Sequence, residues 1–269
     1  MLKTRVLTAL VLLAIVLPAL FLGTPGQFGL VVAVAVVLGA WEWARLLGLP
    51  LAGSVPYALV ALAGVAASYA GVIPSSAWLR PAVLFWLLIG PYTLWRKPQA
   101  RGAWRMFLLL AGWVVLIAAW QAIWLARLHG VIFLLSVLVV VWLADSGAYF
   151  AGRAFGRHKL APGISPGKTW EGAAGGWFLV LLVAAVVMLA GSHGESTLVS
   201  VLVDRFGVAT GAVCLTLLVI YSIVGDLFES QLKRQAGRKD SSGLLPGHGG
   251  ILDRIDALLP VLPLVMLLV

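Results

Sequence analysis

The sequence predicts an all-α membrane protein, a single polytopic bundle of about nine transmembrane helices. Hydrophobic residues make up 62% of the 269-residue chain and charged residues only 11%, and the mean hydropathy is +1.04. Soluble domains are usually about 45–50% apolar and about 25% charged. Apolar runs of membrane-spanning length follow one another along the chain, and Lys and Arg gather in alternate connections. These observations exclude an ordinary soluble domain.

Each predicted span is an apolar run close to the roughly 20 residues that cross a bilayer. The first follows Lys3 and Arg5, as in a secretory signal, but it lacks a clear small-x-small cleavage site and is expected to be a retained anchor. The fourth run is short. The nine runs are roughly 6–22, 26–44, 55–73, 82–95, 105–125, 131–149, 172–190, 208–227 and 252–269.

The distribution of basic residues predicts a cytoplasmic N-terminus and a C-terminus on the far side. With nine spans in this orientation, 16 of the 19 Lys and Arg residues fall in cytoplasmic segments, and only Arg80, Arg127 and Arg205 fall on the far side. Cytoplasmic loops of membrane proteins carry such an excess. The net charge of +9 therefore reflects membrane topology, and we expect no nucleic-acid partner.

The domain organisation is predicted to be one integral membrane domain, 1–269. The N-terminal spans, 1–127, have no assigned role, whereas 128–269 would hold the catalytic spans and cytoplasmic loops. The lone Cys214 cannot form an internal disulfide or a cysteine-based metal site by itself.

Acidic residues are rare and unevenly placed. A carboxylate in or near hydrocarbon costs several kcal/mol and is functional by default, which draws attention to Asp145, Asp226 and Asp253. If Asp226 and Asp253 converge, they form an oxygen site suited to Mg²⁺. Asp256 shares a helix face with Asp253, but a capping role at the helix N-terminus explains it equally well. The seven clustered acids are Asp145, Glu171, Asp226, Glu229, Asp240, Asp253 and Asp256.

Basic residues surround these acids in two clusters. The first cluster lies near the C-terminus and the second follows the sixth span: Lys233, Arg234, Arg238, Lys239 and Arg254, and Arg153, Arg157, Lys159 and Lys168. One cluster alone is typical of a patch that contacts anionic lipid. Two clusters interleaved with aspartates favour a polyphosphate and a metal, because electrostatic clamping drives phosphoryl-type transfer. Asp240 stays open, either as a ligand or as a partner of a neighbouring basic residue.

Two glycine-containing segments complete the candidate site. In LPGHGG, Gly249 and Gly250 allow backbone amides to approach a ligand, and His248 is either a phosphate contact or a plain surface histidine. GISPGKT, 163–169, holds Ser165 and Lys168. It has three residues, where a Walker A loop has four, between its first glycine and Gly-Lys, so a P-loop is excluded. GAAGG, 172–176, has the small-residue spacing of packed membrane helices.

With these motifs assembled, the chain resembles the phosphatidate cytidylyltransferase family, also called CDP-diacylglycerol synthases. The family signature runs Ser-x-apolar-Lys-Arg, four residues, Lys-Asp, then Pro-x-His-Gly-Gly-x-x-Asp-Arg-x-Asp. The segments 144–172 and 225–230 are also similar, so the resemblance covers 144–256 well and the N-terminal spans only by hydropathy. The signature is matched without a gap by Ser230, Leu232, Lys233, Arg234, Lys239, Asp240, Pro246, His248, Gly249, Gly250, Asp253, Arg254 and Asp256.

The resemblance implies that the protein joins CTP and phosphatidate to give CDP-diacylglycerol and pyrophosphate. It places Mg²⁺ on Asp226 and Asp253, with room for a second divalent or monovalent cation. The implied catalytic residues are Asp226, Asp253, Lys233, Arg234, Lys239, His248 and Arg254. The implied substrate-binding residues are Ser165, Lys168, Ser230, Gly249, Gly250, Asp145, Asp240 and Asp256. The expected location is the cell inner membrane with the site facing the cytoplasm; the partners are CTP, phosphatidate and membrane lipids, and a homodimer is left open.

Two alternatives remain from the residues themselves. A CTP-dependent kinase of a lipid alcohol would use similar metal and nucleotide chemistry but transfer the γ-phosphoryl group. An ion-coupled transporter is disfavoured, because transporters place their sites near the bilayer midplane, whereas the acids here gather at one face.

Overall fold

The computed structural model describes residues 2–191 and 196–269. It confirms the all-α polytopic bundle, because eight helices within these ranges are long and apolar enough to cross a membrane. The protein is therefore a multi-pass membrane protein. The eight spans are α1 (Leu2–Phe21), α2 (Pro25–Leu46), α3 (Leu51–Tyr69), the continuous run of α4 (Ser76–Leu84), η1 (Phe85–Ile89) and α5 (Gly90–Arg96), α6 (Gly102–His129), α7 (Val131–Phe155), α8 (Trp170–Ala190) and α10 (Val208–Gln235).

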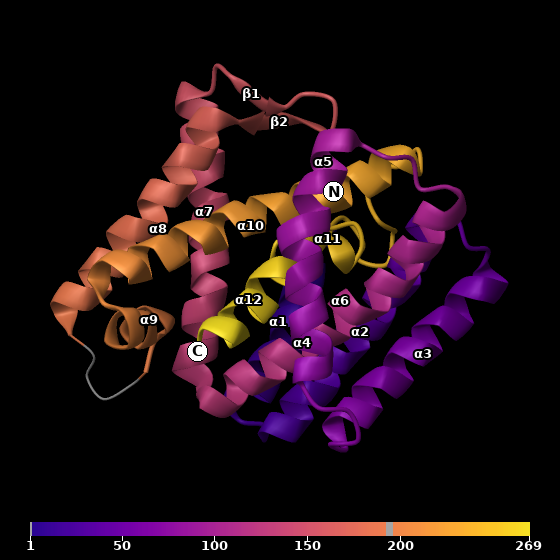
Figure 1. The fold of residues 1–269 in the computed structure, drawn as a ribbon, viewed down its shortest axis with the longest axis horizontal. Helices are drawn as coiled ribbons and strands as arrows, with labels where there is room; N and C mark the ends of the chain where they lie inside the picture. The colour runs from indigo at the N-terminus through magenta and orange to yellow at the C-terminus, as the bar shows by residue number, and fades with distance from the viewer. Residues whose placement is uncertain (1, 192–195) are drawn as a thin grey trace.

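The last apolar segment differs from the predicted ninth span. It forms two short helices, α11 (Leu252–Ile255) and α12 (Leu258–Leu268), and a helix the length of α12 reaches only about 16 Å. The break has two local causes. The Asp256 carboxylate accepts the backbone N–H of Ala257 at 2.8 Å, and Pro260 has no N–H for the carbonyl four residues earlier. The chain ends beside α9 (Leu198–Phe206), where Arg205 Nη1 donates to the Val269 carbonyl at 2.6 Å (Figure 1).

Small residues allow α7 and α8 to pack closely, as the GAAGG segment predicts. A Cβ atom on Gly176 would lie 2.3 Å from the Ala144 carbonyl oxygen of α7, so only glycine permits this approach. On the other side of the bundle lie α2, α3 and α6 (Figure 1). These helices pack around large aromatic side chains. There the buried Trp43 donates to the Leu108 carbonyl at 2.9 Å.

A two-stranded antiparallel hairpin caps one end of α7 and α8, an element that the sequence did not predict. It consists of β1 (Lys159–Ala161) and β2 (Ser165–Thr169) (Figure 1). The Glu171 carboxylate anchors its base by accepting the Arg157 N–H at 3.1 Å and contacting His158 Nδ1 at 2.6 Å. The hairpin therefore holds the GISPGKT segment in a fixed place above the helices.

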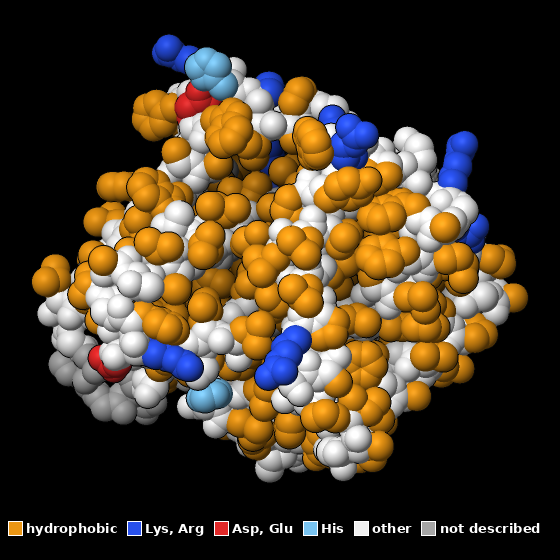
Figure 2. All heavy atoms as spheres, in the orientation of Figure 1, with side chains coloured by type: hydrophobic (Ala, Val, Ile, Leu, Met, Phe, Trp, Pro, Cys, Tyr) orange, Lys and Arg blue, Asp and Glu red, His pale blue; other side chains and the backbone are white. Residues whose placement is uncertain are grey.

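The surface has the pattern expected of a membrane protein. Apolar side chains cover most of the face in Figure 2, and basic side chains gather along the edge that carries the hairpin. Many large apolar residues of α1, such as Leu7 and Leu10, are exposed. Such a surface is suited to contact with lipid rather than with water.

Candidate functional site

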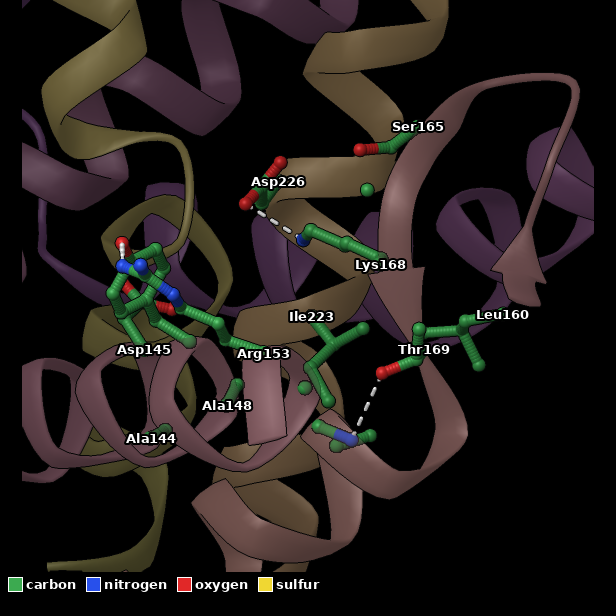
Figure 3. Close-up of a pocket in the computed structure, with 15 residues that line it drawn as sticks. Ala144, Asp145, Ala148, Arg153, Leu160, Ser165, Lys168, Thr169, Ile223 and Asp226 are labelled. Atoms are coloured by element: carbon green, nitrogen blue, oxygen red, sulfur yellow. Dashed lines mark hydrogen bonds and ion pairs between the residues drawn. The ribbon is translucent and has the colours of Figure 1, made fainter. Parts of the chain in front are cut away.

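Nine of the fifteen predicted site residues line one or other of two cavities, and the remaining six line neither. The first, called here the Asp226 cavity, has a volume of about 470 Å³ and lies among α7, α8, α10 and β2. Ala144, Ala148 and Ile223 contribute apolar wall to it (Figure 3). Of the predicted residues it brings together Asp145, Ser165, Lys168 and Asp226.

An ion pair stands at the centre of the Asp226 cavity. Lys168 Nζ, from β2, lies 2.6 Å from Asp226 Oδ2, from α10 (Figure 3). The two side chains are 26% and 30% exposed, so both stay accessible to a ligand. Ser230 Oγ, one turn later on α10, donates to Asp226 Oδ1 at 3.3 Å. The hairpin is what brings Lys168 to Asp226 across the fold.

Asp253 lies outside the linings of both cavities within the described residues, and its oxygens are fully engaged. Oδ1 accepts from Lys233 Nζ at 2.5 Å, while Oδ2 accepts from the N–H and the hydroxyl of Ser241 and from the Gly250 N–H, each at 2.8 Å. Burial tends to raise the pKa of Asp253, but the Lys233 ammonium and the two backbone donors outweigh it, so this pKa is lowered. Asp253 is therefore a charged carboxylate that holds its own loop.

Lys233 is shared between two carboxylates. Its ammonium contacts Asp253 and also Glu229, one turn earlier on α10. The side chains of Glu229 and Asp253 are only 2% and 6% exposed, so this cluster is shielded from water. Sequence reasoning did not place Glu229 in the site, although a Glu and a Lys four residues apart share a helix face and commonly pair.

The junction of α11 and α12, at Asp256, lies against α10 at Gly225. Burial, and then the negative charges of Asp226 and Glu229, raise the pKa of Asp256 well above its usual value. The close approach requires glycine at position 225, since a Cβ atom there would lie 2.4 Å from the Asp256 carbonyl oxygen. Asp226 is thereby placed beside the junction of α11 and α12.

The second cavity, called here the His248 cavity, has a volume of about 500 Å³. It lies in the loop between α10 and α11, residues 236–251, which is called here the signature loop. The predicted residues that line it are Lys239, Asp240, His248, Gly249 and Arg254. No described residue lines both cavities. Gly250, which lines neither cavity, donates its backbone N–H to Asp253. The predicted site is thus two cavities, and the Lys233–Asp253 cluster lies outside the lining of both.

Arg234 occupies a different environment from the other predicted cations. Its Nε donates to the Ile164 carbonyl in the hairpin turn at 3.2 Å, and its Nη1 donates to the Arg238 carbonyl at 3.3 Å. In this arrangement Arg234 ties the hairpin to the end of α10.

Sequence reasoning missed Glu42, a fully buried acid of α2. Its carboxylate accepts the backbone N–H groups of Ile251 at 3.0 Å and Leu252 at 2.7 Å. The Ser242 hydroxyl donates to it at 2.5 Å, and the Ser241 hydroxyl, whose single proton is shared with Asp253, lies 3.2 Å from it. One signal was available, because an acid inside a predicted span is functional by default. Its partners lie 199 to 210 residues later in the chain, so no spacing rule could find them.

The carboxylates of the site meet only part of what a hard divalent cation requires. Among the described residues, no three His, Cys, Asp or Glu side chains form a group that could hold a metal. Asp226 and Asp145 present carboxylates to the same cavity, which suits an ion that binds few protein oxygens and shares its other positions with water and phosphate. Asp253 can serve as a ligand only if it releases some of its present donors, because a carboxylate has about four acceptor positions.

Comparison with known proteins decides the family. A model described as "Cytidylyltransferase family" matches residues 3–269. The chain belongs to the cytidylyltransferase family. The match includes the N-terminal spans, which resembled the family only by hydropathy. It is consistent with the contact of Glu42 with the signature loop, which links both halves of the chain.

Curated relatives cover nearly the whole chain. The phosphatidate cytidylyltransferase of Pseudomonas aeruginosa is 43% identical, over 98% of this chain and 95% of its own. The proteins of the same name from Haemophilus influenzae and Staphylococcus haemolyticus are 39% and 35% identical, over 98% and 99% of this chain and 96% and 98% of their own.

Proposed function

We propose that this protein is a membrane nucleotidyltransferase that joins CTP and phosphatidate, giving CDP-diacylglycerol and pyrophosphate for phospholipid biosynthesis. The observation that carries the proposal is the 43% identity, over 98% of the chain, to a phosphatidate cytidylyltransferase. The accessible Lys168–Asp226 pair supports it, since it sets a cation for phosphate beside apolar wall for a lipid.

The reaction needs positioning and charge more than it needs a strong base. An anionic phosphate oxygen of phosphatidate attacks the α-phosphorus of CTP and forms a new P–O bond. The bond between the α-phosphorus and its bridging oxygen to the β-phosphorus breaks, and pyrophosphate leaves with the electron pair. When the ligand binds, the Lys168 ammonium exchanges Asp226 for a phosphate oxygen. Cations held in place by the protein then stabilise the charge of the transition state. No covalent enzyme intermediate is required.

Mg²⁺ is part of the same proposal. Asp226 would hold it, with Asp145 beside it, and Asp253 would join after exchanging some of its present donors. When bound, the ion would neutralise phosphate charge. Chelation of divalent metals from the purified protein should abolish transfer and added Mg²⁺ should restore it; transfer that persists in excess chelator would contradict this part.

The proposed location is the inner membrane with both cavities facing the cytoplasm. The basic residues at the cavity end of the bundle support this orientation, and CTP is a cytosolic substrate. A cysteine introduced at Arg238 should react with an impermeant thiol reagent only in inverted vesicles. Reaction in right-side-out vesicles alone would reverse the orientation. The homodimer stays a prediction, checked by the molar mass of the detergent-solubilised protein.

One assay separates this function from the lipid-alcohol kinase. Purified protein in detergent micelles is given phosphatidate and CTP labelled at the α- or the γ-phosphate. Nucleotidyl transfer places the α-label in lipid and the γ-label in pyrophosphate, whereas a kinase with an alcohol acceptor releases CDP. Asp226→Asn should lower transfer by at least about 100-fold, and Asp204→Asn, at an exposed position on α9, is the matched control. Release of CDP with γ-labelled lipid would overturn the proposal.

A further inference from the structure

The His248 cavity differs in chemistry from the Asp226 cavity. Its lining comes from the loop between α10 and α11, from Arg254 of α11 and from Arg5 of α1. Charged, polar and glycine residues make up nine of its eleven lining residues, whereas five of the fifteen residues lining the Asp226 cavity are aliphatic. A polar cavity of about 500 Å³ is suited to a water-soluble ligand rather than to acyl chains.

The charges around the His248 cavity are unbalanced. Three cations, Arg5, Lys239 and Arg254, face one acid, Asp240. None of the three cations forms an ion pair with any residue in the described ranges, 2–191 and 196–269. Arg254 Nη2 donates to the His248 carbonyl at 2.7 Å, which fixes one edge of its guanidinium. Cations brought together without counter-charges favour an anionic ligand.

One ring nitrogen of His248 is buried and also lacks a hydrogen-bond partner. His248 Nδ1 is shielded from solvent and forms no hydrogen bond within the described part of the chain. A buried polar atom left unpaired costs free energy, and a rotation of the ring that turned Nδ1 toward the cavity would let a phosphate oxygen pair with it.

Arg5 is placed in the cavity by contacts of α1 with the signature loop. Thr8 Oγ1 donates to the Pro246 carbonyl at 3.0 Å. The aliphatic part of Arg5 packs on Gly247, where a Cβ atom would lie 2.8 Å from Arg5 Cγ. The first helix, otherwise largely exposed along its length, is thereby fixed at the end that carries Arg5.

We infer that the His248 cavity binds a diphosphate group, namely the β- and γ-phosphates of the nucleotide and then the pyrophosphate product, and that Arg5 of α1 is one of its ligands. The inference rests on the proposed function for the identity of the nucleotide. It assigns a role to the first span, and it separates the water-soluble leaving group from the lipid in the Asp226 cavity.

The test is equilibrium binding of labelled inorganic pyrophosphate to the full-length protein in detergent. Arg5→Ala and Lys239→Ala should each weaken binding by about tenfold or more, because each removes a charge-assisted hydrogen bond. Lys3→Ala, an exposed cation two residues earlier on the same helix, should leave binding unchanged. Melting temperatures equal to that of the unmodified protein establish that the variants are folded.

Two outcomes would overturn the inference. One is pyrophosphate binding by Arg5→Ala and Lys239→Ala at the unmodified strength. The other is that short-chain phosphatidate displaces pyrophosphate and itself binds more weakly to both variants, which would make the cavity a lipid-phosphate site.

The α-labelled CTP assay on the same preparation separates this inference from the proposed function. If labelled CDP-diacylglycerol forms but Arg5→Ala binds pyrophosphate normally, the inference fails and the function stands. If no labelled lipid forms but pyrophosphate binding follows Arg5, the function fails and the cavity remains a diphosphate site.

Discussion

The Glu42 carboxylate of α2 lies 2.7 Å from the backbone nitrogen of Leu252, at the start of α11. The same carboxylate accepts from Ile251 and from the hydroxyls of Ser241 and Ser242. The backbone N–H of Ser241 in turn donates to Asp253. A span with no predicted role thus holds the loop that carries most of the signature residues.

Glu42→Gln should lower both stability and activity. The amide has nearly the same size, but its NH₂ group cannot accept a hydrogen bond, so buried donors of the loop lose their partner at a cost of about 1–3 kcal/mol. Thermal unfolding in detergent and the kcat of nucleotidyl transfer measure the two effects. Asp204→Asn, at an exposed site, should change neither. A Glu42→Gln protein that melts and turns over normally would remove the anchoring role.

Lys168 and Asp226 should act as a unit in catalysis. We expect Lys168→Ala and Asp226→Asn each to lower kcat/KM by at least about 100-fold, the scale seen when a transition-state charge partner is lost. Because the two groups are 2.6 Å apart, the double variant should lose much less than the product of the single losses. Lys159→Ala, an exposed cation of the same hairpin, is the control. Independent, multiplicative losses would argue against a shared role.

Lys233→Met should destabilise the protein severely. The change leaves Glu229 and Asp253 buried without their shared cation, and breaking a buried ion pair costs about 3–5 kcal/mol. Thermal melting compares it with Lys239→Met, at an exposed position, which should be nearly neutral. Adding Glu229→Gln should recover part of the loss, because one buried charge is then removed. A normal melting temperature for Lys233→Met would show that the cluster contributes little.

Gly225→Ala should disturb the contact between α10 and the C-terminal helices. Its Cβ atom would lie 2.4 Å from the Asp256 carbonyl oxygen and 2.8 Å from the Pro260 ring, and overpacking of this kind costs about 1–3 kcal/mol. Activity should fall as well, since Asp226 would move with the helix. The control is Gly53→Ala in α3, where an added Cβ makes only ordinary contacts. If both variants melt at the same temperature, the close packing at Gly225 is not required.

Much of the fold and part of the candidate site could be predicted from local patterns. Apolar runs identified the spans, because a helix in lipid must satisfy its backbone internally and present apolar side chains. The fixed polar spacing from Ser230 to Asp256 indicated the family, which the match over residues 3–269 supports. The ninth span was not predictable in detail, since Pro260 and Asp256 break a run that is apolar enough to cross the membrane.

The sequence alone therefore determined the membrane class, the approximate spans and the chemical types of the site residues, all of which depend on composition and short-range periodicity. Only the tertiary structure decided that Lys168 meets Asp226, that Asp253 is held by Lys233 and Ser241, and that Glu42 supports the loop. The physical reason is that these contacts join distant segments across the bundle. They depend on how helices pack, and close approaches such as Gly225 to Asp256 join residues that no local spacing pairs.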